Sequence, residues 1–160
     1  MKPSSTIFLR IVIFILGLPI LAACFYVYPI VTLRGSEILP QFAFMRIPYL
    51  TILYVASLLY FFALYQGFRL LNYIDQNNAF SDLSVNALKN IKISALTITL
   101  LLISFMPVAY TVGDMDDAPG IIILAAAIVF IPLVISVFAA LLEKLLHEAI
   151  QIKSENDLTV

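Results

Sequence analysis

The sequence contains few of the residues that a soluble protein needs at its surface. Only 12% of its 160 residues are charged, against about 25% in soluble domains. It has one cysteine, one histidine and no tryptophan. A single cysteine excludes a disulfide framework, and a single histidine excludes a haem held by two histidines. The formal net charge of −1 offers no excess of basic residues for direct nucleic-acid binding.

Hydrophobic residues make up 62% of the chain, and the mean hydropathy is +1.05. Four runs contain no charged residue at all: 11–33, 47–68, 93–113 and 118–142. Each is long enough for a helix that crosses a bilayer core of about 30 Å. The sequence therefore predicts an all-α fold, an integral membrane four-helix bundle in one domain over 1–160. The expected spans are about 8–32, 47–70, 92–113 and 119–142.

The direction of the spans follows from the basic residues in the connections, because cytoplasmic loops carry more Lys and Arg. Only two basic residues, Arg34 and Arg46, fall in the first loop, and none falls in the third. The other seven fall in the N-terminus, the second loop and the C-terminal segment: Lys2, Arg10, Arg69, Lys89, Lys92, Lys144 and Lys153. We therefore predict a multi-pass protein of the bacterial plasma membrane with both termini in the cytoplasm.

Two helices are expected to continue beyond the membrane. Ser81 fits a helix N-cap, and Asp82 in the first turn favours the helix dipole. An amphipathic extension at 82–91 would then lead into the third span, and another at 143–152 would follow the fourth. The polar tail 153–160 is expected to be frayed. The two apolar stripes most simply cover each other, and the alternative is a docking groove for a partner.

The first span also carries a short pattern of another kind. Leu21-Ala22-Ala23-Cys24 matches the lipobox at which bacterial lipoproteins are cleaved and acylated. The apolar run continues beyond Cys24 to Val31, which favours an ordinary membrane helix with a buried thiol.

Residues that would support catalysis or ion transport are missing from the four runs, which hold no ionisable side chain. Asp114, Asp116 and Asp117 lack the spacing of a calcium loop, and acids just before a helix stabilise its start. We therefore predict no enzyme activity, no catalytic residue, no metal and no cofactor. Hydroxyls such as Ser94 and Thr97 could instead line a path for a neutral solute, in a small transporter or channel subunit.

Three segments carry a resemblance to a known family. They are Phe80-Ser81 leading to 87–92, then 116–122, then 152–160 at the end of the chain. Together they are similar to a family of small bacterial membrane proteins, domain of unknown function 2975. The resemblance implies a four-helix membrane protein and assigns no activity or catalytic residue.

Members of that family are often encoded beside a small helix-turn-helix regulator of the Xre type. The resemblance therefore implies a non-enzymatic membrane regulator that binds or sequesters such a transcription factor, and the lipid bilayer and a homo-oligomer are the other expected partners. The residues expected to contact the regulator lie on the two extensions and the tail: Leu83, Leu88, Lys89, Lys92, Leu145, His147, Glu148 and Asp157.

Overall fold

Helices account for nearly all of the chain in the computed structural model, which describes residues 3–159. Those residues form no strand. The helical elements are α1 (Pro3–Ala22), a π-helical turn η1 (Ala23–Val27), α2 (Tyr28–Ile38), a 3-10 helix η2 (Pro40–Met45), α3 (Arg46–Asp75), α4 (Asp82–Ile103), α5 (Met106–Met115) and α6 (Pro119–Leu158).

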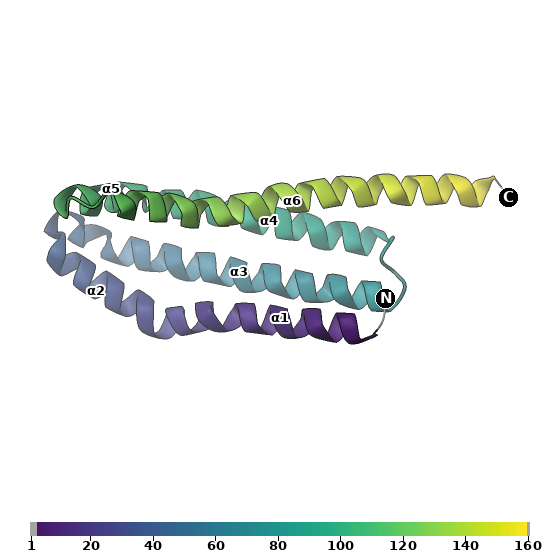
Figure 1. The fold of residues 1–160 in the computed structure, drawn as a ribbon, viewed down its shortest axis with the longest axis horizontal. Coiled ribbons are helices and arrows are strands. Elements are labelled where there is room, and N and C mark those ends of the chain that lie inside the picture. The colour runs from purple at the N-terminus through teal and green to yellow at the C-terminus, as the bar shows by residue number, and fades with distance from the viewer. Residues whose placement is uncertain (1–2, 160) are drawn as a thin grey trace.

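Four helical stretches are long and apolar enough to cross a membrane: Thr6–Ile38, Pro40–Asp75, Asp82–Met115 and Pro119–Leu158. This confirms the all-α fold with four spans. Helix α1 begins and α6 finishes at the same end of the bundle, here called the terminal end (Figure 1). At 1.5 Å per residue, the 40 residues of α6 rise about 60 Å, roughly twice the thickness of a bilayer core. Helix α6 therefore extends well beyond the membrane at the terminal end.

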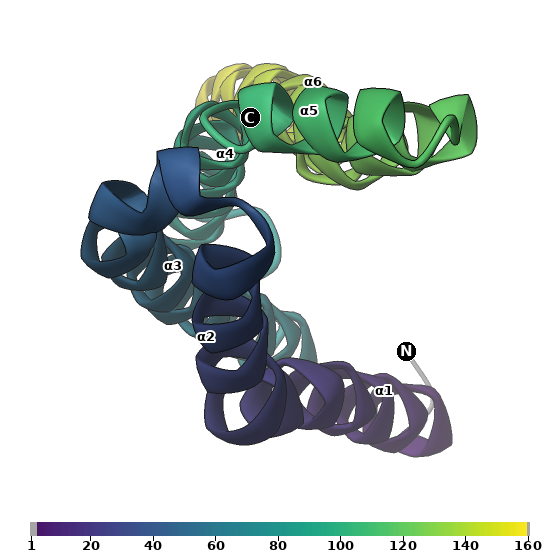
Figure 2. The ribbon, with the colours of Figure 1, turned by 90° about the vertical axis from the view of Figure 1, so that its left-hand side faces the viewer.

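The helices pack in the order in which they occur along the chain. Helix α3 lies between α1 and α4, and α4 lies between α3 and α6, while α5 packs on α6. The bundle is open, because α1 and α6 stand apart at the two ends of a C-shaped arrangement (Figure 2). Helices α1 and α6 each have a wide apolar surface that no other helix covers.

The interior of the bundle consists mainly of small side chains. Large apolar residues point outwards, as expected where lipid is the solvent, and small residues allow helices to approach closely. The buried residues of α3, α4 and α6 are Ala56, Ser57, Gln66, Ser84, Ala87, Leu88, Ser94, Ala95, Ile98, Thr99, Ser136 and Ala139.

Local sequence signals explain how α4 begins. Ser81 has extended backbone angles, φ −140° and ψ 157°, and its Oγ accepts a hydrogen bond from the Ser84 N–H at 3.4 Å. Asn77 adopts a positive φ of 58°, which Asn tolerates better than most residues. The N-cap expected at Ser81 is therefore confirmed.

The first connection differs from the expected short loop at 34–46. Helix α2 continues to Ile38, and η2 follows directly after Leu39. Leu39 departs from helical angles, with φ −122° and ψ 75°, because Pro40 disfavours a helical conformation in the residue before it. The chain therefore crosses from the first span to the second with a single non-helical residue.

Two prolines act differently from each other. Pro107 stands in the first turn of α5, after a break at Ser104 and Phe105 that separates α5 from α4. Pro132 lies inside α6, which continues on both sides of it.

The expected fraying from residue 153 is wrong, since α6 remains helical to Leu158.

Candidate functional site

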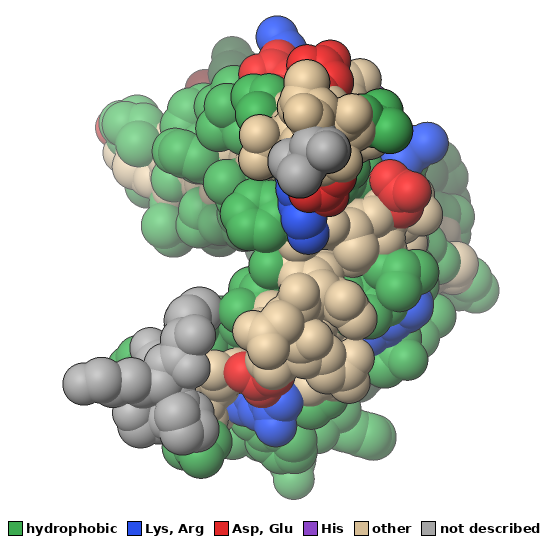
Figure 3. Space-filling model, turned by 90° about the vertical axis from the view of Figure 1, so that its right-hand side faces the viewer, with side chains coloured by type: hydrophobic (Ala, Val, Ile, Leu, Met, Phe, Trp, Pro, Cys, Tyr) green, Lys and Arg blue, Asp and Glu red, His purple; other side chains and the backbone are tan. Residues whose placement is uncertain are grey.

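An apolar groove runs along the inside of the C. Its volume is about 470 Å³, and all four spans contribute to its walls. Figure 3 shows a hollow on one side of the molecule between the two arms of the C. Residues from α3 and α4 form its floor, and Ile128, Ile131 and Ile135 of α6 form one rim.

The polar groups in the groove walls already have hydrogen-bond partners. The Tyr28 Oη lies 3.0 Å from the Ser57 Oγ, and the Tyr60 hydroxyl donates to the Leu16 carbonyl oxygen at 2.9 Å. The groove is therefore suited to an apolar occupant.

The hydroxyls that could line a solute path are placed elsewhere. Ser94 is buried, and Thr97 donates to the Ile93 carbonyl oxygen in its own helix at 2.8 Å. Thr99 does the same with the Ala95 carbonyl oxygen at 3.0 Å. Neither Ser94 nor Thr97 lines the groove.

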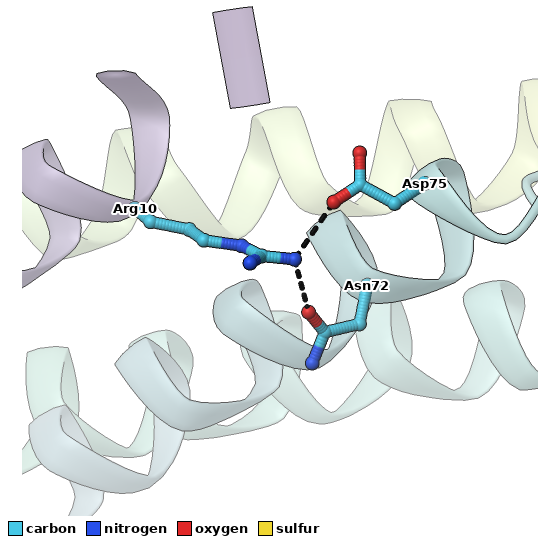
Figure 4. Close-up of polar contacts among 3 residues, drawn as sticks. All are labelled: Arg10, Asn72 and Asp75. Atoms are coloured by element: carbon cyan, nitrogen blue, oxygen red, sulfur yellow. Dashed lines mark hydrogen bonds and ion pairs between the residues drawn. The ribbon is translucent and has the colours of Figure 1, made fainter. Parts of the chain in front are cut away.

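At the terminal end, a polar cluster joins α1 to α3 (Figure 4). The Arg10 Nη2 donates to the Asn72 Oδ1 and the Asp75 Oδ2, each at 2.7 Å. The guanidinium also lies over the Phe68 ring, with 5.4 Å between its central carbon and the ring centroid. From the sequence, Arg10 indicated only the orientation of the first span, because its partners lie 62 and 65 residues away along the chain.

A second ion pair joins α4 to α6. The Lys92 Nζ donates to the Glu143 Oε2, and both side chains are largely shielded from solvent. About two turns earlier on α6, the Ser136 Oγ donates to the Lys92 carbonyl oxygen at 3.0 Å. Lys92, expected to contact a partner protein, is therefore already engaged within the chain.

The remaining residues of the expected partner surface divide into two groups. Leu88 is buried inside the bundle, with only 6% of its surface exposed. The others are exposed and lie on the first turns of α4 or on the distal part of α6: Leu83, Lys89, Leu145, His147, Glu148 and Asp157. Every residue from 151 to 159 is exposed.

Cys24 lies within the uninterrupted helical stretch of the first span, Thr6–Ile38. Cys24 belongs to η1, between α1 and α2, and is half-buried. Its carbonyl oxygen accepts a hydrogen bond from the Tyr54 hydroxyl at 2.9 Å. The residue is thus part of the packing between the first two spans.

The described residues contain no group of three His, Cys, Asp or Glu side chains arranged to hold a metal ion. The acidic residues of the third connection instead surround a tight turn, in which Asp117 has a φ of 51°. Helix α6 begins two residues later at Pro119, where the sequence predicted it.

Comparison with known proteins agrees with these features. The family described as "Protein of unknown function (DUF2975)" matches residues 32–160. The chain belongs to this family. It is 52% identical, over the full length of both chains, to the uncharacterized membrane protein YoaS of Bacillus subtilis (strain 168). No solved structure matches the chain. The family resemblance expected from the sequence is therefore confirmed, and the chain is a membrane protein of the DUF2975 family.

Proposed function

We propose that this DUF2975 protein is a non-enzymatic regulator that binds a small helix-turn-helix transcription factor at its terminal end. The supporting observation is the distal part of α6, which remains helical to Leu158 and is exposed from residue 151 onwards. Figure 1 shows this part extending past the ends of α3 and α4. A helix that projects from the membrane offers a partner protein a preformed surface.

Charge supports a basic partner. Residues 153–159 contain Lys153 against Glu155 and Asp157, so the end of α6 is acidic on balance. A DNA-binding protein carries basic residues for phosphate contacts, and an acidic surface that pairs with them competes with DNA. Of the eight basic residues that the structure describes, six lie toward the terminal end, which supports its placement in the cytoplasm, where such a partner is found.

The alternative, a channel or transporter for a neutral solute, has less support. Its expected lining hydroxyls are satisfied within their own helices or buried, and the groove walls are apolar.

The experiment is a pull-down from detergent-solubilised membranes of cells that express the tagged full chain. We expect a helix-turn-helix protein to be recovered with it, and more of it at low salt than at high salt. Asp157→Lys should reduce recovery, while Asp116→Lys at the other end of the bundle should not. Recovery of no such protein, together with unchanged expression of neighbouring genes after deletion, would contradict the proposal.

A further inference from the structure

Helix α6 carries a heptad repeat along most of its length. Apolar residues alternate at spacings of four and three, which are the a and d positions of a coiled coil. They are Leu124, Ile128, Ile131, Ile135, Phe138, Leu142, Leu145, Ala149 and Ile152. All of them except Ala149, which is half-buried, are exposed. We call this row the α6 seam.

Within the membrane, an exposed apolar row alone says little, because lipid covers every face. There, Ile123, Phe130 and Val137 are also exposed, at the c positions of the same repeat. Beyond Glu143, as far as residue 157, exposed large apolar side chains occur at the seam positions alone. The exposed large apolar side chains between 143 and 157 are Leu145 and Ile152, at 61% and 67%. They are seven residues apart and therefore occupy the same d position of the repeat.

Between residues 144 and 154, the other positions carry polar residues or face α4, and farther along, Leu158 is exposed at a c position. The c and f positions are Lys144, Gln151, His147 and Ser154, all of which are exposed. Leu146 and Ile150 are half-buried and share the helix face of Glu143, which pairs with Lys92 of α4. The projecting part of the seam therefore remains a narrow apolar strip that none of the described elements covers.

The charges beside the strip indicate what covers it. Glu148 occupies a g position, and Lys153 occupies the e position of the next heptad. In a parallel two-stranded coiled coil, each g residue meets the e residue five positions later on the other helix. A second copy therefore pairs Glu148 with Lys153 twice, once on each side of the seam. Asn156 falls at the following a position, where a buried Asn favours a parallel dimer in register.

We propose that two copies of this protein associate in parallel through the α6 seam. Both copies have the same orientation in the membrane, as a parallel pair requires. Ile128, Ile131 and Ile135 belong both to the seam and to the rim of the groove, so the second α6 lies along the mouth of the groove. His147, Ser154 and Asp157 stay on the outside of the pair. The inference does not depend on the proposed transcription-factor partner.

Disulfide cross-linking tests the seam with the purified full chain in phospholipid vesicles. Cys24→Ala removes the native thiol, and a single cysteine is introduced at Leu145 or Ile152. His147→Cys and Ser154→Cys, two residues away on the outer face of the same turns, are the matched controls. We expect about tenfold more covalent dimer at the seam positions, because outer positions are too far apart to bridge.

Charge exchange provides the second test and leaves the apolar seam intact. Glu148→Lys or Lys153→Glu alone should lower cross-linking through Leu145→Cys by about fivefold, since two attractive pairs become repulsive. The double exchange should restore it. Residues five apart do not face each other on one helix, so restoration requires contact between two copies.

Two results would overturn the proposal. One is equal cross-linking at seam and outer positions, or none at Leu145 and Ile152. The other is a double exchange that stays as weak as the single variants. Because the vesicles contain no other protein, neither result depends on whether a transcription factor binds.

Discussion

At the scale of single residues, Gly113 of α5 lies close against the start of α6. A Cβ at this position would lie 2.9 Å from the Ile122 Cγ1 and 3.3 Å from the Ala118 carbonyl oxygen. Cβ atoms essentially never approach a carbon atom that closely, so the Ile122 side chain or the helices must shift to admit one. The glycine therefore allows the third span to pack against the start of the fourth.

Gly113→Ala should lower stability by about 1–3 kcal/mol, the usual cost of overpacking. Thermal unfolding in detergent, followed by circular dichroism, would show this as a lower Tm. Gly35→Ala is the matched control, because a Cβ there has nothing within 4 Å. Equal Tm values for the two variants would show that α5 and α6 are not held together at Gly113.

Gln66 is the second residue whose environment predicts a measurable effect. Only 3% of its surface is exposed, and its Oε1 has no hydrogen-bond partner among the described residues. A buried acceptor without a partner costs stability, so Gln66→Met, of similar size, should raise it by about 1 kcal/mol. Gln151→Met, on the exposed part of α6, should leave the Tm unchanged. A lower Tm for Gln66→Met would mean that the amide makes a stabilising contact.

At the scale of elements, the Lys92–Glu143 pair fixes the position of α6 against α4. Neither charge is freely solvated, so removal of one partner leaves the other uncompensated. Lys92→Met or Glu143→Gln alone should destabilise the protein by about 1.5–3 kcal/mol. The double variant should lose less than the sum of the two. The free energies of unfolding of the unchanged protein, the two single variants and the double variant form a double-mutant cycle. Strictly additive losses would show that the two groups do not interact.

The sequence predicted helices where local chemistry determines them. Ser81 caps α4 and Pro119 opens α6, because capping and the missing proline N–H act within one turn. The break between α4 and α5 was not predicted, because proline inside a membrane span is compatible with either a kink or a stop. Pro132 has the same sequence signal, and α6 continues through it.

The candidate site was predictable only in part for a related reason. Exposed residues such as His147 and Asp157 follow from the amphipathic pattern of a single helix. The engagement of Lys92 by Glu143, 51 residues away, depends on which helices become neighbours. The same holds for Arg10 and for the burial of Leu88. Apolar periodicity identifies a membrane helix but does not determine which neighbour it faces, because lipid covers an apolar face as well as protein does.

At the scale of the whole molecule, the open arrangement leaves α1 and α6 exposed along one side. Each of these helices contacts one neighbouring span, whereas α3 and α4 contact two. The two ion pairs, Arg10 with Asp75 and Lys92 with Glu143, close the terminal end on both arms of the C. The opposite end carries two arginines and the acidic turn before α6. The charges therefore distinguish the two ends, and this difference predicts how the molecule inserts.

The distribution of Lys and Arg predicts that the terminal end faces the cytoplasm. In a Cys24→Ala background, single cysteines at Glu37 and Asp116 report on the opposite end, and cysteines at Asn78 and Ser154 report on the terminal end. All four native residues are exposed. A membrane-impermeant maleimide added to intact cells should label the first pair and should label the second pair only after the membrane is permeabilised. Labelling of all four after permeabilisation is the control for accessibility. The reverse pattern would place the projecting part of α6 outside the cell, out of reach of any transcription factor, and would leave the α6 seam unaffected.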